Sequence, residues 1–125
     1  MEFVRERELV GKVLPGRIIT KIVGGDSPIK SSAMSVGYGM YCEEAGVMEP
    51  HCHAEESVYI LDQKDAIVRY GGDKDNLLYS LKLEKDMLLH FDENEWHVFE
   101  YEPGGFLKIL FIYGTGDQVR PEDKK

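Results

Sequence analysis

The hydrophobic and polar positions of the chain follow the two-residue period of β-strands rather than the longer period of helices. The clearest case is Met34–Cys42, where apolar or aromatic residues at even positions alternate with serine, glycine and tyrosine at odd ones. Glycine, proline, aspartate and asparagine, which favour turns, stand between the apolar segments. The pattern predicts strands at Arg17–Val23, Met34–Cys42, Ser57–Asp62, Ala66–Tyr70, Leu77–Leu83, Met87–Phe91, His97–Tyr101 and Phe106–Tyr113.

Polar and glycine-rich segments are predicted to end these strands. A turn at 63–65 and breaks at 71–76 and 103–105 would divide the middle of the chain into short pieces. Many short strands at regular spacing predict an all-β sandwich or barrel. Little helix is expected, at most one turn near Arg5–Val10, and the charged tail Arg120–Lys125 is expected to fray.

Length and charge narrow the functional class. A chain of 125 residues predicts a single domain over 1–125. The net charge of −8 argues against nucleic acid and against an anionic membrane surface as partners. The charged N-terminus has no signal peptide, and no apolar segment approaches the roughly 20 residues of a membrane helix. With two cysteines, Cys42 and Cys52, expected as free thiols, a cytoplasmic location is predicted.

The segment Pro50–Leu61, PHCHAEESVYIL, carries the main candidate chemistry. On a strand, His51 and His53 project to one side and Cys52 to the other. Two neutral imidazoles with a carboxylate close behind are typical of a divalent-metal site. The alternative is an exposed strand with two solvated histidines.

A second segment, Asp86–His97, changes the balance between these alternatives. A strand leads into a tight turn, and His97 begins the next strand. Together with the H-x-H pair, this order resembles the two motifs of the cupin superfamily, at about 46–63 and 86–101. The resemblance implies a double-stranded β-helix, a jelly-roll barrel of the RmlC-like kind.

By this resemblance the metal ligands are His51, His53, Glu56 and His97. Glu56 stands three residues before Tyr59, the usual offset, and Glu55 is the alternative because a one-residue slip reverses the face. Other positions depart from the motifs, with Gln63 at one glycine and Asp86, Asp92 and Asn94 at the second motif's glycine, proline and glycine. Asn94 is a mild change, because asparagine tolerates the left-handed backbone that a turn needs.

The implied cofactor is one divalent ion, Fe, Mn, Ni, Co or Zn. The expected function is a metal-dependent enzyme, an oxygenase, isomerase or lyase, that acts on a small organic molecule. A binding or sensing module without turnover and a structural metal site are the alternatives. Unperturbed histidines titrate near about 6.5, so metal binding is expected to weaken as the pH falls from 7 towards 5.

Alternation along the strands also predicts the surroundings of the site. Val58 and Ile60 are expected to point inward, as are Phe99 and Tyr101 and, with core packing preferred, the even residues of Met34–Met40. His90 is either a base near the metal or a partly buried histidine, and Trp96 should point outward.

The basic residues Arg17, Lys21 and Arg69 cannot be oriented, so a mostly neutral small-molecule substrate is predicted. Phe106, Leu110 and Ile112 face outward opposite inward Leu107, Ile109 and Phe111, and this two-sided apolar strand predicts a homodimer.

Overall fold

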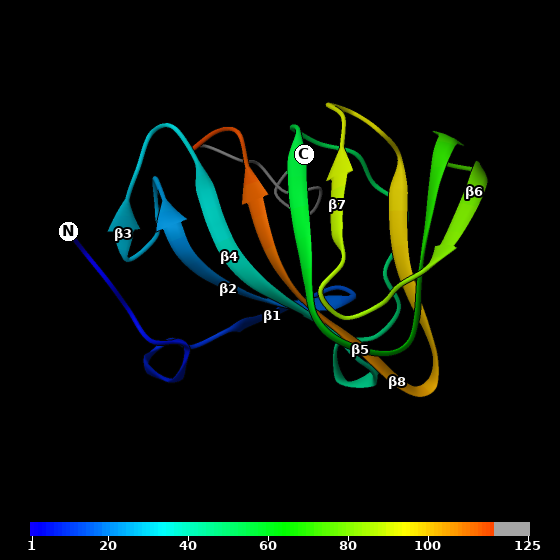
Figure 1. Cartoon of the computed structure of the whole chain (residues 1–125), viewed down its shortest axis with the longest axis horizontal. Coiled ribbons are helices and arrows are strands. Elements are labelled where there is room, and N and C mark those ends of the chain that lie inside the picture. The colour runs from blue at the N-terminus through cyan, green and yellow to red at the C-terminus, as the bar shows by residue number, and fades with distance from the viewer. Residues whose placement is uncertain (117–125) are drawn as a thin grey trace.

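The computed structural model describes residues 1–116, which form one curled and almost entirely antiparallel sheet (Figure 1). The predicted all-β architecture is confirmed, and the predicted tail Arg120–Lys125 lies outside the described residues. The strand order is β1-β2-β4-β8-β5-β6, with β3 beside β2 and β7 beside β5. No helix in the described part is long and apolar enough to cross a membrane. The elements are η1 (Glu6–Glu8), β1 (Lys12–Leu14), β2 (Arg17–Gly24), β3 (Ile29–Lys30), β4 (Ser35–Tyr41), η2 (Glu43–Ala45), β5 (Glu56–Asp73), β6 (Asn76–Lys82), β7 (Leu88–Phe91) and β8 (His97–Tyr113).

Two long strands, β5 and β8, replace the four short strands that the sequence predicted in these regions. Figure 1 shows both strands curving round the lower edge of the molecule, so that each serves both halves of the roll. At the bend, Lys64 pairs with Phe106 and Ala66 with Tyr101, which leaves residues 102–105 opposite the single residue Asp65. The predicted turns at 63–65 and 103–105 are therefore bulges, which bend a strand without ending its pairing.

The break predicted at 71–76 is also shorter than expected. The glycines of the 71–76 segment continue β5 to Asp73, and the turn before β6 is only Lys74 and Asp75. Gly71 and Gly72 have φ of 80° and 77°, a backbone conformation that side chains rarely adopt. Here the glycines permit a twisted end to a hairpin, so they are part of the strand and not the loop.

The inward face of β4 is the opposite of the predicted one. Gly37, Gly39 and Tyr41 are buried, whereas Val36, Tyr38 and Met40 are half-buried on the outer face. A Cβ on Gly37 would lie 2.5 Å from Cζ of Phe111. The glycines face inward because large side chains of β8 occupy the space. The apolar and polar pattern of β4 alone gives no information about the side chains that face it.

The predicted inward positions on β5 and β8 are confirmed and form the core of the roll, except Tyr101, which is half-buried with its hydroxyl on the carbonyl of Gly46 at the surface. Val58 and Ile60 of β5 have 0% exposure, and β8 buries Leu107, Ile109 and Phe111 on the same interior. The alternate residues of β8 lie outward as predicted, with Phe106 and Leu110 half-buried and Ile112 exposed. Each long strand therefore buries residues on both sides of an exposed bend, and the candidate site lies at the strand ends marked by Glu56, His97 and Tyr113.

Candidate metal centre

The two histidine segments of the sequence are joined by backbone hydrogen bonds. His51 and His97 form an isolated antiparallel bridge, with N–O distances of 3.0 Å in both directions. The amide of Asn94 donates to the carbonyl of His53 over 2.7 Å, and Asn94 has φ of 62°. The turn therefore uses the left-handed conformation predicted for this asparagine, and it fixes the H-x-H segment to the start of β8.

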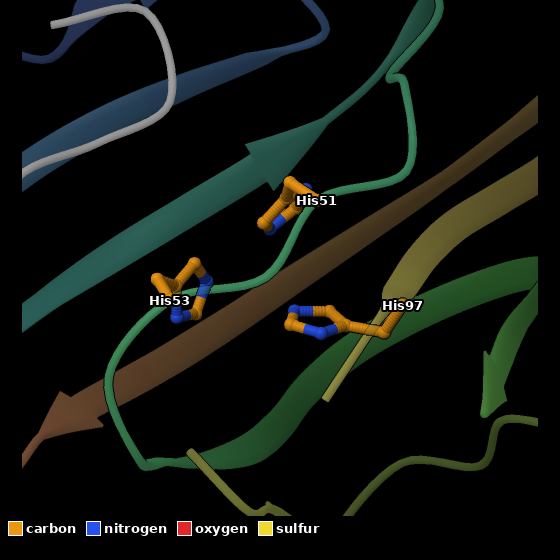
Figure 2. A group of neighbouring side chains, drawn as sticks. All are labelled: His51, His53 and His97. Carbon is orange, nitrogen blue, oxygen red and sulfur yellow. The ribbon is translucent and has the colours of Figure 1, made fainter. Parts of the chain in front are cut away.

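The side chains of His51, His53 and His97 converge on one small space (Figure 2). One ring nitrogen from each lies within 4.8 Å of the others. His53 and His97 are buried, with exposures of 6% and 1%, whereas His51 is half-buried at the edge. The prediction that Cys52 points elsewhere agrees with this group, which contains only the three histidines within the described residues.

Each imidazole is oriented by a backbone carbonyl next to its Nδ1. Because a carbonyl can only accept, Nδ1 carries the proton in each ring and Nε2 keeps its lone pair. Phe91 stacks on the His97 ring at 4.0 Å and further limits its rotation. The three Nδ1 contacts are His51 to Glu49 O at 3.3 Å, His53 to Ala54 O at 3.1 Å and His97 to Glu95 O at 2.8 Å.

Glu56 places a carboxylate among these rings. It is the first residue of β5, pairs with Phe91 and Tyr113 on either side, and is 4% exposed. Its Oε1 lies 3.5 Å from Nε2 of His53 and 3.7 Å from Nε2 of His97. The Tyr113 side chain hydrogen-bonds to the same carboxylate and so holds its orientation.

Burial controls the protonation of the centre. It raises the pKa of Glu56 to about 8, against smaller lowering effects of the Tyr113 hydrogen bond and the Arg17 charge. It lowers the pKa of His97 to about 4 and that of His51 to about 2, the latter also through the neighbouring His97. In the folded protein these two imidazoles are neutral throughout pH 5–7, so they do not titrate in the range that the sequence predicted.

The donor set fits one divalent ion. Among residues 1–116, Glu56 Oε1 and His97 Nε2 are buried without a hydrogen-bond partner, an arrangement that is costly unless something binds there. The cavity between the four residues measures about 10 Å³, about the room of one water-sized particle. Ligand atoms about 2.1 Å from one ion lie roughly 3 to 3.5 Å apart, close to the distances from Glu56 to the rings.

Glu55 and His90 lie on the other side of the strand. His90 Nε2 is 2.8 Å from Oε2 of Glu55, and His90 Nδ1 is 2.8 Å from Oγ of Ser57. The side chains of Glu55 and His90 are 61% and 49% exposed. Glu55, the alternative carboxylate ligand, thus lies away from the three histidines. His90, predicted to be either a base near the metal or a partly buried histidine, is a surface residue. Trp96, predicted to point outward, is half-buried.

The sequence did not indicate Tyr113 as part of the centre, and it left Arg17 without an orientation. Tyr113 continues the inward row of Leu107, Ile109 and Phe111 by two residues, so the same alternation extended further would have found it. Arg17 is 8% exposed and lines the cavity together with His51 and Glu56. It shares a face with buried Ile19, but no pattern in the sequence says which face of that strand is inside.

No protein-family model and no curated protein matches the chain. Solved structures do match, at low sequence identity. A protein from Planctomyces limnophilus has 14% identity and a TM-score of 0.69, covering 98% of this chain and 94% of its own. The polyketide cyclase RemF from Streptomyces resistomycificus has 15% identity and a TM-score of 0.68, covering 96% and 82%.

A larger protein matches over part of its length. The oxalate decarboxylase of Lactobacillus farciminis, solved as a formate complex, has 14% identity and a TM-score of 0.70. The match covers 90% of this chain but 33% of the decarboxylase, so the chain spans about a third of that protein. Together these likenesses show that the chain has the cupin jelly-roll fold predicted from its motifs.

Proposed function

We propose that this protein is a metal-dependent enzyme that acts on a small organic molecule, with His51, His53, Glu56 and His97 holding one divalent ion. The observation that carries the proposal is the convergence of three oriented imidazoles on a buried carboxylate whose Oε1 has no hydrogen-bond partner. Fe, Mn, Ni, Co and Zn all suit a site of imidazole and carboxylate donors.

The surrounding residues prepare the four side chains for this role. The carbonyls beside Nδ1 fix the tautomers, and the Tyr113 hydrogen bond fixes Glu56. Phe91 and Phe99, which are 4% and 2% exposed, keep water from the inner side. When bound, a divalent ion would supply Lewis acidity and, for a redox metal, electron-transfer chemistry.

The structural likenesses support this proposal without fixing a reaction. Their names span an oxalate decarboxylase, a polyketide cyclase, a DMSP lyase and HppE, which was solved with Fe(II). One fold thus accommodates several reactions on small molecules, and function must be argued from the site.

The direct test is the metal content of the purified protein. Replacing both His51 and His53 by alanine removes two of four donors, so we expect metal measured by elemental analysis to fall from about one equivalent to background. His90→Ala is the matched control, because it removes a histidine from the surface. Equal metal in the double variant and the control would refute the proposed site.

Ligand binding without turnover is the second candidate, because an open cleft of about 420 Å³ beside His51 offers room for a ligand next to the ion. The two are separated by loading the protein with the metal that elemental analysis identifies and screening small organic acids, alcohols and ketones for conversion. Oxygen consumption in the same assays separates an oxygenase from an isomerase or lyase. Tight ligand binding with no conversion across the screen would favour the second candidate.

We also propose a homodimer formed through the outer face of β4 and β8. Val36 pairs with Ile112 and Tyr38 with Leu110, so an apolar strip crosses both strands on the side away from the core. Such strips are commonly covered by a partner. Light scattering at micromolar concentration is expected to give twice the chain mass, and a monomer mass would refute the dimer.

A further inference from the structure

We propose that Arg17 binds an anionic group of the substrate, a carboxylate, in the open cleft beside His51. The inference rests on the proposed function and extends it by naming the chemical class of the substrate. It replaces the neutral substrate expected from the sequence, where no basic residue could be oriented.

Arg17 is held at a largely buried position. It is 8% exposed, and an arginine buried to this degree is normally paired. One guanidinium nitrogen donates to the carbonyl of Pro15 over 2.8 Å, which fixes the side chain at the start of β2. Its charge lowers the pKa of both Glu56 and His51, so the guanidinium lies within electrostatic reach of the metal centre.

Arg17 also connects two spaces. It lines the small cavity of the metal centre and also an open cleft of about 420 Å³. His51 is the other residue that lines both spaces. We call the open space the Arg17 cleft; its lining is Pro15, Arg17, Val47, Met48, Glu49, Pro50 and His51. A ligand in this cleft would contact the guanidinium and the exposed edge of the proposed metal site together.

The neighbouring cleft has the opposite charge. That space measures about 470 Å³, and four carboxylate residues line it, namely Glu43, Asp65, Glu100 and Glu102. Phe99, which is 2% exposed, is its one lining residue in common with the metal cavity. Of these two clefts, the Arg17 cleft is therefore the better one for an anion, with Glu49 at its exposed rim.

The test uses the metal-loaded protein and the probes malonate and malonamide, which share a skeleton and differ in charge. By calorimetric titration we expect malonate to bind the wild-type protein, and Arg17→Gln to weaken that binding at least about tenfold, because a charge-assisted contact is lost. Malonamide binding should be unchanged. Arg69→Gln removes the same charge from the exposed surface and should leave both probes unaffected.

The possible failures are distinguishable. Absence of metal from the wild-type protein refutes the proposed function before any probe is added. Metal at one equivalent with equal malonate affinity in Arg17→Gln and Arg69→Gln overturns the Arg17 inference alone. A drop in metal content of Arg17→Gln at unchanged malonate affinity of the loaded fraction would mean that Arg17 only balances Glu56, and this too overturns the inference.

A measurement on the wild-type protein covers the case in which Arg17→Gln does not fold. Phenylglyoxal modifies arginine side chains, and peptide mass spectrometry reports each position separately. Malonate is expected to protect Arg17 and not Arg69, and malonamide to protect neither. Modification of Arg17 at the same rate with and without malonate would overturn the inference.

Discussion

Glu55 and Glu56 are neighbours in sequence, and each lies beside histidine, yet the two clusters have opposite environments. Glu56 faces inward at 4% exposure, among the rings of His51, His53 and His97. Glu55 faces solvent, where it contacts His90 in an exposed pair with Ser57 beyond. The inner cluster has polar atoms without partners, whereas the outer cluster satisfies its own hydrogen bonds. The comparison shows that a histidine beside a carboxylate is not enough, and that the convergence of three buried imidazoles on a buried carboxylate makes one cluster a candidate metal site.

The largest expected difference between the clusters is in metal affinity. Glu56→Gln removes an anionic donor from the proposed site and should weaken metal binding by at least about 100-fold, above the loss typical of residues that only support a ligand. Glu55→Gln should change it by less than about twofold. Competition with a chromogenic chelator measures both. A larger loss of metal affinity in Glu55→Gln than in Glu56→Gln would mean that Glu55 is the ligand, and the difference between the inner and outer clusters would disappear.

The next difference is in the pH dependence of stability without metal. Because the folded-state pKa of Glu56 is raised from 4.5 to about 8, its contribution is full below 4.5 and is lost as the pH rises towards 8. Because the pKa values of His51 and His97 are lowered from 6.5, their contribution is full above 6.5 and is lost as the pH falls below it. The combined stability from these groups therefore peaks near pH 6.5.

Urea unfolding of chelator-treated protein at pH 5, 6.5 and 8 measures this peak. Between pH 6.5 and 8 the free energy of unfolding is expected to fall by about 1 kcal/mol in total. The proton that Glu56 binds only in the folded state contributes a slope of at most about 1.4 kcal/mol per pH unit, and the remaining titration of the histidines in the unfolded chain offsets part of it. Glu56→Gln should abolish the fall, and Glu55→Gln should retain it. A wild-type curve without a fall between pH 6.5 and 8 would contradict the raised pKa of Glu56.

Proton release on metal binding sharpens the comparison further. At pH 7 Glu56 is mostly protonated in the metal-free fold, whereas His51 and His97 are already neutral. Binding a divalent ion should therefore release about one proton, and that proton comes from Glu56. Calorimetry in buffers of different ionisation enthalpy counts it. The Glu56→Gln variant loaded at high metal concentration should release none, and release of two or more would show that the imidazoles are protonated in the fold.

The smallest effect is expected from the outer cluster. Replacing both Ser57 and His90 by alanine removes an exposed hydrogen-bonded pair, and such pairs contribute less than about 1 kcal/mol. Urea unfolding at pH 7 should show a change within that limit, with metal content unchanged. A loss of several kcal/mol or of the metal would mean that the outer cluster positions the inner one, and the two could no longer be treated as separate.

The sequence by itself determined the fold class and the histidines that meet. Alternation of apolar residues predicted an all-β chain, and the H-x-H pair with the distant His97 predicted a centre that the structure assembles. These features could be predicted because a strand places every second residue on one face. The spacing of two nearby residues therefore tells whether their side chains point to the same side. Asn94 was readable for a similar reason, since few residues adopt the left-handed turn that it makes.

Only the tertiary structure decided which face of a strand is inside and whether a break ends it. Gly37 and Gly39 face inward because Phe111 and Ile109 fill the space beside them, a contact between strands about 70 residues apart in sequence. Arg17 shares a face with Ile19, and only the pairing of β2 with β4 places that face against the histidines. The glycines of 103–105 continue a strand because β5 pairs on both sides of them. Each of these outcomes depends on where a segment distant in sequence packs, and the spacing of residues within one segment carries no information about that.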